Sequence, residues 1–327
     1  LGGTSKAIKR VRRMVEKVAD TDANVLIMGD SGSGKEVVAR NIHYQSSRRN
    51  KHFVQINCGA IPSELLESEL FGYEKGAFTG ANKRTLGKVE TANGGTLFLD
   101  EIGDMPADLQ TRLLRILAQG EFYRVGGHMP IKVDVRVIAA THQNLEHLVK
   151  EGKFREDLLH RLNVIRVHVP SLRERNTDVV ELANHFLKLA ATELEQETKQ
   201  LLPETKDYLC SLPWPGNVRQ LENFCRWVTV MASGSEIHID DLPPELKQEV
   251  EAVEFSDEWE TSFRKWVESS LLQGDTALLR DAVPRFETVL IEEALKKTGG
   301  RRQDAAKLLG WGRNTLTRKI KQLNLDS

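Results

Sequence analysis

The sequence predicts an α/β fold built on a parallel sheet, followed by a smaller helical part. Five short apolar runs are typical of buried strands, at 24–28, 53–57, 96–100, 135–140 and 164–169. Helical patterns lie between most of them, at 6–19, 35–46 and 108–120. Such alternation favours a parallel sheet covered by helices on both faces. From about Leu172 the strand signals stop, and amphipathic patterns such as 178–194 predict a helical domain.

The composition is that of an ordinary globular protein, with 40% hydrophobic and 28% charged residues among 327. No apolar run approaches the roughly 18 residues that a bilayer span needs, and no signal-peptide pattern opens the chain. We therefore expect no membrane association and a cytoplasmic location. Cys58, Cys210 and Cys225 form no CxxC pair, which favours reduced thiols. Because the chain begins at Leu1 rather than Met, we expect it to lack an N-terminal part.

The segment GDSGSGKE follows the first predicted strand and opens a helix. Its residues are Gly29, Asp30, Ser31, Gly32, Ser33, Gly34, Lys35 and Glu36. In this context the spacing predicts a nucleotide site: glycines let successive N–H groups face one phosphate, and the helix N-terminus adds partial positive charge. Lys35 would reach the β- and γ-phosphates. The alternative is a glycine turn with a surface lysine. Glu36 stands where Ser or Thr usually ligates Mg²⁺, so the metal must rely on another carboxylate.

That carboxylate is available where the third predicted strand ends, at Asp100 and Glu101. Asp100 suits the Mg²⁺ shell, directly or through water. Glu101 suits polarising a water for in-line attack on the γ-phosphate. An acidic pair alone is weak evidence, but with a phosphate loop upstream it predicts ATP hydrolysis rather than nucleotide binding alone.

The segment ELFGYEKGAFTGANK, residues 69–83, begins as a helix and continues into a glycine-rich stretch. Its centre is Gly76, Ala77, Phe78, Thr79, Gly80 and Ala81. Glycine adds conformational freedom to the backbone, yet an aromatic residue lies between two glycines. From spacing alone, Phe78 packed in the core beneath a glycine turn is the simpler interpretation; a loop that presents Phe78 to a partner is the other.

The last 32 residues are basic. Residues 296–327 hold nine Lys/Arg against Asp304 and Asp326, a charge of +7, so the rest of a chain with net charge −1 carries −8. The run 301–325 predicts helix, tight turn, helix, in which the small Ala305 and Ala306 permit close helix approach and Leu308, Leu309, Leu316 and Ile320 supply a small core. Its second helix presents Arg313, Asn314, Thr315, Thr317, Arg318, Lys319 and Lys321. These residue types suit bases and phosphates in a major groove. The alternative is a basic surface hairpin.

Together these motifs resemble the AAA+ ATPases, and more specifically the bacterial enhancer-binding proteins that activate sigma-54 RNA polymerase. The residues that carry the resemblance are GDSGSGKE, ELFGYEKGAFTGA, GGTLFLDEIGDM, FREDLLHRL (154–162), WPGNVRQLEN (214–223) and GWGRNTLTRKIKQL (310–323). The resemblance covers essentially the whole chain and is greatest to members in nitrogen regulation, without their receiver domain. It implies an AAA+ P-loop ATPase with a helical lid and a Fis-like helix-turn-helix domain.

The resemblance also implies roles for single residues. Asn57 would hydrogen-bond Glu101 and gate it with nucleotide state. His142, where many relatives have Asn, would sense the γ-phosphate. Arg219 would sense nucleotide from the lid, and loop 76–81 would contact sigma-54.

Two arginines match the family's arginine fingers, which act on a neighbouring subunit's ATP. They are Arg155 and Arg161. From the residues alone a surface salt bridge is the simpler interpretation, since Asp157 and Arg161 are at i, i+4. Fingers supplied in trans imply a hexamer-like ring.

The expected organisation is an ATPase subdomain at 1–170, a lid at 171–242, a linker at 243–258 and a helical dimerisation and DNA-binding domain at 259–327. The expected ligands are ATP and Mg²⁺, and the expected partners are enhancer DNA, sigma-54 RNA polymerase and further copies of the chain. Two alternatives share the phosphate loop and basic tail: an AAA+ replication initiator or helicase loader, and a DNA-binding regulator whose ATP only controls assembly. Only loop 76–81 distinguishes a sigma-54 activator from these two alternatives, because by resemblance the loop belongs to sigma-54 activators.

Overall fold

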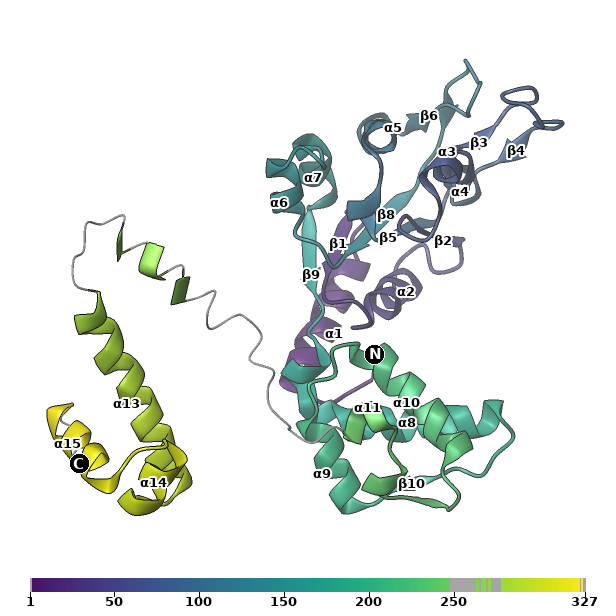
Figure 1. Ribbon diagram of the computed structural model, residues 1–327. Coiled ribbons are helices and arrows are strands. Elements are labelled where there is room, and N and C mark those ends of the chain that lie inside the picture. The colour runs from purple at the N-terminus through teal and green to yellow at the C-terminus, as the bar shows by residue number, and fades with distance from the viewer. Residues whose placement is uncertain are drawn as a thin grey trace. The chain divides into compact units, whose positions relative to one another are not determined.

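The computed structural model describes residues 2–247, 263–264, 266–268, 270–271, 278–323 and 325. The chain divides into two units, Leu1–Lys247 and Gln248–Ser327, which are described separately (Figure 1). Most of the expected linker at 243–258, and the start of the last expected domain at 259, lie outside the described residues. Within the described residues, no helix combines the length and apolar character needed to cross a membrane.

A five-stranded parallel sheet forms the centre of the first unit, as predicted. Its order is β2-β5-β8-β1-β9. The bounds are β1 (Val25–Met28), β2 (Phe53–Asn57), β5 (Thr96–Asp100), β8 (Arg136–Thr141) and β9 (Ile165–His168). All neighbouring pairs are parallel, so the carboxyl ends of the strands share one edge. Asn57 pairs with Asp100 in register at that edge.

Helices cover the two faces of this sheet with different apolar clusters. Leu97 and Leu99 of β5 pack with side chains of α3, α4, α5 and α7, whereas Phe98 between them packs with α1 and α2. This alternation follows from the two-residue repeat of a strand and buries both faces. The helices concerned are α1 (Lys6–Ala19), α2 (Lys35–Gln45), α3 (Ser63–Phe71), α4 (Lys88–Thr91), α5 (Ala107–Gln119), α6 (Leu145–Lys150) and α7 (Glu156–Leu162).

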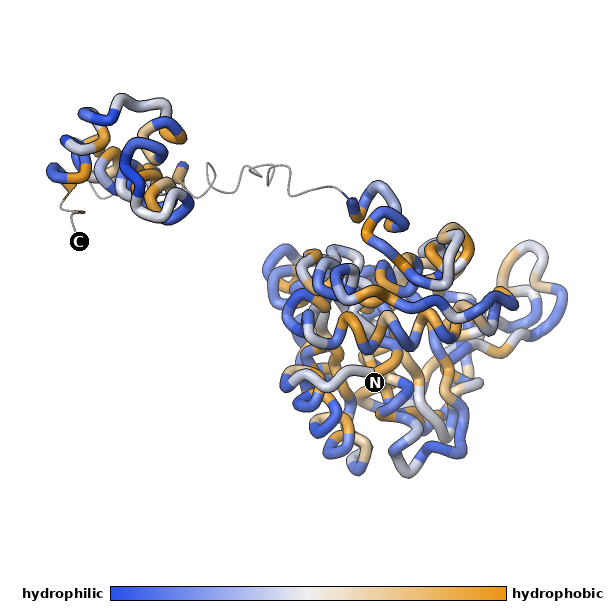
Figure 2. The backbone as a smooth tube through the Cα atoms, turned by 90° about the horizontal axis from the view of Figure 1, so that it is seen from below, coloured by the Kyte–Doolittle hydropathy of each residue, from blue (hydrophilic) through white to orange (hydrophobic). Residues whose placement is uncertain are grey.

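Amphipathic periodicity explains how the outer helices attach. In α1 the buried side chains recur every three or four positions, at Ile8, Val11, Val15 and Val18, which places them on one helical face. Figure 2 shows hydrophilic and hydrophobic residues alternating along the chain of this unit. The Ser5 side chain caps α1 by accepting a hydrogen bond from the N–H of Ile8.

Two short hairpins project side by side from this unit (Figure 1). One pairs β3 (Gly72–Tyr73) with β4 (Thr85–Leu86), and the other pairs β6 (Glu121–Phe122) with β7 (Ile131–Lys132). They are joined through Val125, whose N–H donates to Gly72 O at 2.9 Å and whose carbonyl accepts from Glu74 N at 3.0 Å. Loop 76–81 is the tip of the first hairpin.

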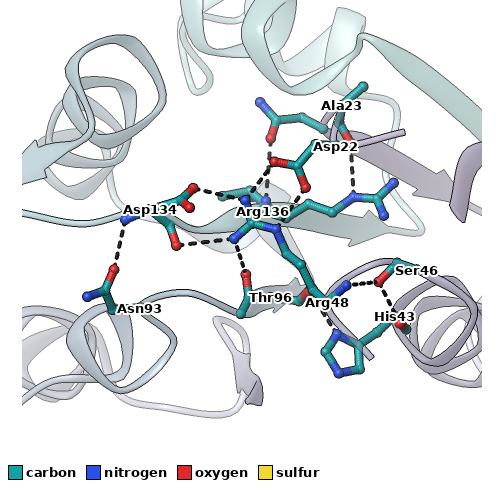
Figure 3. Close-up of polar contacts among 12 residues, drawn as sticks. Asp22, Ala23, His43, Ser46, Arg48, Asn93, Thr96, Asp134 and Arg136 are labelled. Atoms are coloured by element: carbon teal, nitrogen blue, oxygen red, sulfur yellow. Dashed lines mark hydrogen bonds and ion pairs between the residues drawn. The ribbon is translucent and has the colours of Figure 1, made fainter. Parts of the chain in front are cut away.

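A polar network lies at the amino ends of the strands, opposite the edge that carries Asp100 (Figure 3). Arg48 donates to both carboxylate oxygens of Asp22, at 2.8 and 2.6 Å, and to Asp134 at 2.9 Å. The buried Arg136 donates to the carbonyl of Val18 at 2.7 Å, near the end of α1. The network thus ties α1 and the loops around it to the sheet, far from the candidate catalytic residues.

The rest of the first unit is helical, as the sequence predicts. It contains α8 (Val179–Glu193), α9 (Pro203–Ser211), α10 (Asn217–Met231) and α11 (Pro244–Lys247), with a two-stranded pair of β10 (Gln200–Leu201) and β11 (Glu236–Ile237). A separate core includes Leu182, Trp214, Leu221 and Phe224. We call residues 172–247 the lid. A short 3₁₀ segment, Leu172–Asp178, joins it to the sheet.

The second unit contains α13 (Leu279–Lys297), α14 (Arg302–Leu308) and α15 (Arg313–Gln322). Leu316 and Ile320 pack against Ala305 and Ala306 in a small core, as expected. The expectation for Leu308 is wrong, because its side chain is 56% exposed. Helical geometry gives the reason: Ala305, Ala306 and Leu309 lie on one arc of α14, and residue 308 falls outside that arc.

Candidate functional site

The phosphate loop connects β1 to α2 at the carboxyl edge of the sheet. Gly32 and Gly34 adopt left-handed φ values of 74° and 105°, which favour glycine. A Cβ on Gly32 would lie 2.4 Å from the carbonyl oxygen of Gly216. The loop is therefore a tight turn pressed against the lid. Lys35, 6% exposed, donates from Nζ to the carbonyls of Gly29 at 2.9 Å and Asp30 at 3.1 Å.

Asp100 and Glu101 lie beside this loop, as the sequence predicts. Lys35 Nζ is 3.8 Å from Glu101 Oε1, although the two residues are far apart in the sequence. Burial raises the pKa of Asp100, and the neighbouring charge of Glu101 raises it further. Glu101 has a left-handed φ of 51°, an uncommon conformation for a non-glycine residue. It turns the chain sharply at the strand end, so the two carboxylates stand at the same edge.

The Glu101 carboxylate pairs with His142, not with Asn57. His142 Nδ1 lies 2.6 Å from Glu101 Oε2. The Asn57 side chain instead accepts hydrogen bonds from the N–H groups of Gly59 at 2.9 Å and Ala60 at 3.1 Å. The Asn57–Glu101 bond that the family resemblance implies is thus replaced in this structure by a turn within the Asn57 loop. Both residues still lie at the same strand edge.

The acidic side chains fit a magnesium ion only together with phosphate. In the described part of the chain, no three His, Cys, Asp or Glu side chains are grouped to hold a metal alone. Mg²⁺ commonly binds one or two carboxylates plus substrate phosphates. Asp100 supplies such a carboxylate, and a nearby cation would offset the burial that raises its pKa. Glu36 is exposed and pairs with Arg40 at 2.9 Å.

A cavity of about 710 Å³ opens beside the phosphate loop. Its walls come from the loop, from α2, from the lid and from the start of the chain: Gly2, Ser33, Gly34, Val37, Arg175, Glu181, Leu182, Asn184, His185, Phe186, Lys188 and Val218. The volume and the mixture of apolar and polar walls are typical of small-molecule sites.

Three lid residues donate hydrogen bonds to the phosphate loop, and one of them, Arg175, also lines the cavity. Arg175 Nη2 donates to Ser33 O at 3.0 Å, and Asn217 Nδ2 donates to Ser31 O at 2.9 Å. The N–H of Arg219 donates to Gly32 O at 3.3 Å, and its side chain is exposed. Arg219 is predicted from the sequence but Arg175 and Asn217 are not, because no local pattern reveals a contact across more than 140 residues.

The two candidate fingers lie at opposite ends of α7, and both are exposed. The Arg155 side chain donates to Asp157 at 3.0 and 2.8 Å and to Thr111 Oγ1 at 3.3 Å. The ion pair at Asp157 therefore involves Arg155, not Arg161 as the i, i+4 spacing suggests.

Most of loop 76–81 is exposed, whereas Ala77 is half-buried and Ala81 is buried. Phe78 is 48% exposed, and its ring meets that of Tyr73 edge-on, with centroids 4.8 Å apart. Gly76 and Gly80 have φ values of 82° and 100° with open space around them, so glycine is needed there for backbone conformation. The interpretation that places Phe78 in the core is wrong, because the hairpin holds it at the surface.

An arginine that the sequence analysis misses supports this hairpin. Arg124, 9% exposed, donates to both carboxylate oxygens of Glu90 at 2.7 and 2.8 Å, and to Glu74 at 2.7 Å. It comes from the neighbouring hairpin, so it ties the two projections together. Nothing in local sequence distinguishes Arg124 from a surface arginine.

In the second unit, α15 begins after Gly312 and carries the predicted DNA-contact residues. Arg313, Asn314, Arg318 and Lys321 are exposed, whereas Thr315, Thr317 and Lys319 are partly buried. Lys319 Nζ donates to both oxygens of Glu287 on α13, at 2.6 and 2.7 Å. The charge of Lys319 is thus partly neutralised by Glu287 within the unit.

Comparison with known proteins finds family models that match three successive parts of the chain. The model for the sigma-54 interaction domain matches residues 1–168, that for the AAA+ ATPase lid domain matches 173–258, and that for the Fis family of bacterial regulatory proteins matches 282–323. The chain is 57% identical to NtrC of Escherichia coli K12 over 99% of its length and 70% of that protein, and 44% identical to AtoC of that strain over 98% and 67%.

Solved structures agree with this result. NtrX from Brucella abortus in complex with ADP superposes with a TM-score of 0.72 at 38% identity, over 99% of this chain and 70% of that one. The same protein in complex with ATP gives 0.70 at 37% identity, over 99% and 69%. These matches set aside the replication-initiator alternative. The chain is an AAA+ ATPase with a Fis-type helix-turn-helix domain, and it belongs to the NtrC family of sigma-54-dependent transcriptional activators.

Proposed function

We propose that the chain couples ATP hydrolysis at the phosphate loop to opening of sigma-54 promoters through loop 76–81. Two features carry the proposal together: Lys35 and Glu101 face each other at 3.8 Å, and the same unit displays an exposed Phe78 between the strands of a hairpin. The first is a site for phosphoryl chemistry, and the second is an exposed surface for a partner.

Each site residue has its own role in the proposed hydrolysis of ATP. The loop amides and Lys35 hold the phosphates, and Glu101 orients and deprotonates the attacking water. Asp100 would hold Mg²⁺, directly or through water, and the metal would neutralise charge on the phosphates. The base of ATP would occupy the 710 Å³ cavity, because that cavity adjoins the phosphate loop. NtrX, a relative, is known in complex with ADP and with ATP. His142 and Asn57 adjust Glu101, and Arg219 approaches the phosphates from the lid.

Arg155 and Arg161 complete the site of a neighbouring copy in a hexamer-like ring. Both guanidinium groups are exposed at the ends of α7, outside their own site. A planar guanidinium stabilises the charge of the transferring phosphoryl group. A head-to-tail contact of this kind closes into a ring when its rotation permits.

The second unit binds enhancer DNA as a dimer. The basic face of α15 suits a major groove. Helix α13 carries exposed apolar side chains at Leu279, Val283, Phe286, Val289 and Leu290. From Leu279 to Phe286 they are three or four residues apart, and both Val289 and Leu290 continue the stripe at that spacing from Phe286. Such a stripe is costly to leave in water, and a second copy of α13 offers a matching surface. Two α15 helices would then read two half-sites.

We assign the chain to nitrogen regulation in the cytoplasm, in a two-component system. The 57% identity to NtrC of E. coli supports the first point. The direct test of the function is promoter opening by this protein with purified sigma-54 polymerase, enhancer DNA and ATP. ATP should open the promoter and ADP should not; opening that is equal without hydrolysable ATP would contradict the proposal.

A further inference from the structure

The first described residues form a strap on the lid. Gly2–Ser5, which we call the strap, precede α1 and lie against α8 (Figure 1). Gly2 is a wall of the 710 Å³ cavity together with Glu181 and Leu182 of α8. A segment distant in sequence from the phosphate loop therefore closes one side of the nucleotide pocket.

One fully buried carboxylate holds the strap. Asp178 is 0% exposed. Its Oδ1 accepts from the N–H groups of Thr4 and Ser5, both at 2.8 Å, and its Oδ2 accepts from Ser5 Oγ at 2.6 Å. Hydrogen bonds to a buried charged group are among the stronger ones. Glu181 adds a longer bond from the N–H of Gly3, at 3.3 Å.

The fit between strap and lid is tight enough to exclude even a methyl group. A Cβ on Gly3 would lie 2.5 Å from Asp178 Oδ2, and Gly3 has a left-handed φ of 109°. A Cβ on Gly2 would lie 2.8 Å from the Leu182 side chain. The strap thus occupies one defined position, which depends on Asp178.

The element that carries Asp178 also holds the phosphate loop. Arg175, three residues earlier in Leu172–Asp178, is 5% exposed, lines the cavity and donates to Ser33 O at 3.0 Å. Leu172–Asp178 therefore binds the pocket's phosphate side through Arg175 and its strap side through Asp178. A change at the Arg175–Ser33 contact and a change at the Asp178–strap contact would therefore affect the same cavity.

We propose that Asp178 is a positioning residue for nucleotide binding, which holds the strap as a wall of the nucleotide cavity. The inference rests on the proposed binding of ATP in that cavity. A nucleotide that touches the docked strap binds the docked form more tightly, so by linkage it stabilises the bonds of Thr4 and Ser5 to Asp178. Asp178 touches neither the reacting phosphate nor the water, so it acts on affinity rather than on the chemical step.

The test compares variants of the whole chain for ADP affinity, for steady-state ATP hydrolysis and for hydrogen exchange of the strap amides. Asp178→Asn should weaken ADP binding and raise KM about tenfold, with kcat within about twofold. Ser5→Ala removes the bond from Ser5 Oγ to Asp178 and also the side-chain cap of α1, and it should change the ADP affinity and KM about threefold. The matched control is Asp241→Asn, since Asp241 caps a lid turn through the N–H of His238 and does not line the cavity; it should change neither quantity.

Hydrogen exchange separates positioning from simple loss of stability. In the unaltered protein ADP should slow exchange at Thr4 and Ser5, and this slowing should disappear in Asp178→Asn. If Asp178→Asn does not fold, Ser5→Ala decides by the same readouts. Unchanged ADP affinity and unchanged strap protection in a folded variant would overturn the inference.

One further variant distinguishes this inference from the proposed site. Lys35→Ala should abolish ADP binding if the phosphate loop is the nucleotide site. Loss of binding in Lys35→Ala with no effect in Asp178→Asn would reject the strap's role alone. Full ADP binding by Lys35→Ala would reject the site itself.

Discussion

His142 Nδ1 lies 2.6 Å from Glu101 Oε2, while the other oxygen of the same carboxylate lies 3.8 Å from Lys35 Nζ. The carboxylate proposed to activate water is thus held between two strand ends, β5 and β8, and the phosphate-loop helix. Its position depends on Lys35 and His142, the residues proposed to contact the γ-phosphate, and this would give nucleotide state a direct route to the base.

Glu101 and His142 should act as one unit. Glu101→Gln should lower kcat by about 10²–10⁴-fold, because a general base is lost, while ATP still binds. His142→Ala alone should change kcat. Added to Glu101→Gln, it should change kcat little further, because the effect of His142 on kcat passes through Glu101. Steady-state hydrolysis by the two single variants and the double variant measures this coupling. Effects that simply multiply would show that the two residues act independently.

Arg161 should act on the ATP of a neighbouring copy. Arg161→Ala should lose most hydrolysis and retain ATP binding, because its guanidinium supports the transition state. Mixing Arg161→Ala with Glu101→Gln should restore part of the activity, since some contacts then pair an intact base with an intact arginine. A mixture no more active than its components would argue against action in trans. The same mixture with Arg155→Ala tests the other candidate.

Arg124 should couple the ATPase to the hairpin. Arg124→Ala removes three hydrogen bonds to Glu90 and Glu74 and should loosen loop 76–81. We expect ATP hydrolysis within about threefold and a loss of promoter opening of about tenfold or more, because bonds to charged groups commonly contribute 1.5–3 kcal/mol. Arg84→Ala is the matched control. Arg84 lies on the hairpin that carries loop 76–81, and its exposed side chain makes a weaker contact with Glu90, at 3.9 Å. Equal loss of hydrolysis and opening would mean a general structural defect.

The network at Arg48 should make stability depend on pH. The hydrogen bond from Arg48 lowers the pKa of Asp22 from its ordinary 3.8, so this contribution is present above that pH and disappears as pH falls through the lowered value. Arg48→Ala should cost about 2 kcal/mol at neutral pH, and the difference from the unaltered protein should shrink in acid below about pH 3.8. Urea unfolding across pH measures it. Arg166→Ala, at an exposed pair with Glu146, should cost under about 1 kcal/mol.

Much of the fold follows from local sequence. The strand β5 and the helix α1 have the predicted bounds, because a short continuous apolar run and an apolar repeat of about 3.6 residues can both be recognised without a distant partner. The nearness of the phosphate loop to Asp100 and Glu101 also follows from the sequence, since the strand ends of a parallel sheet meet at one edge.

The contacts that shape the pocket could not be found in this way. Asp178 and Arg175 act on residues more than 140 positions away, and Asn57 bonds within its own loop instead of to Glu101. The strands of the two hairpins are two residues long, too short to leave a periodic pattern. Tertiary packing determines all of these, and it carries no local signature.

The central claim is that loop 76–81 delivers the work of ATP hydrolysis to sigma-54 polymerase. Thr79 is exposed beside Phe78 in the hairpin loop. The most direct measurement is therefore promoter opening by Thr79→Ala, with ATP hydrolysis and enhancer binding measured on the same preparation. The account predicts near-normal hydrolysis and DNA binding with open complexes reduced at least about tenfold, because an exposed residue contributes to partner contact rather than to folding. Undiminished promoter opening by Thr79→Ala would contradict it.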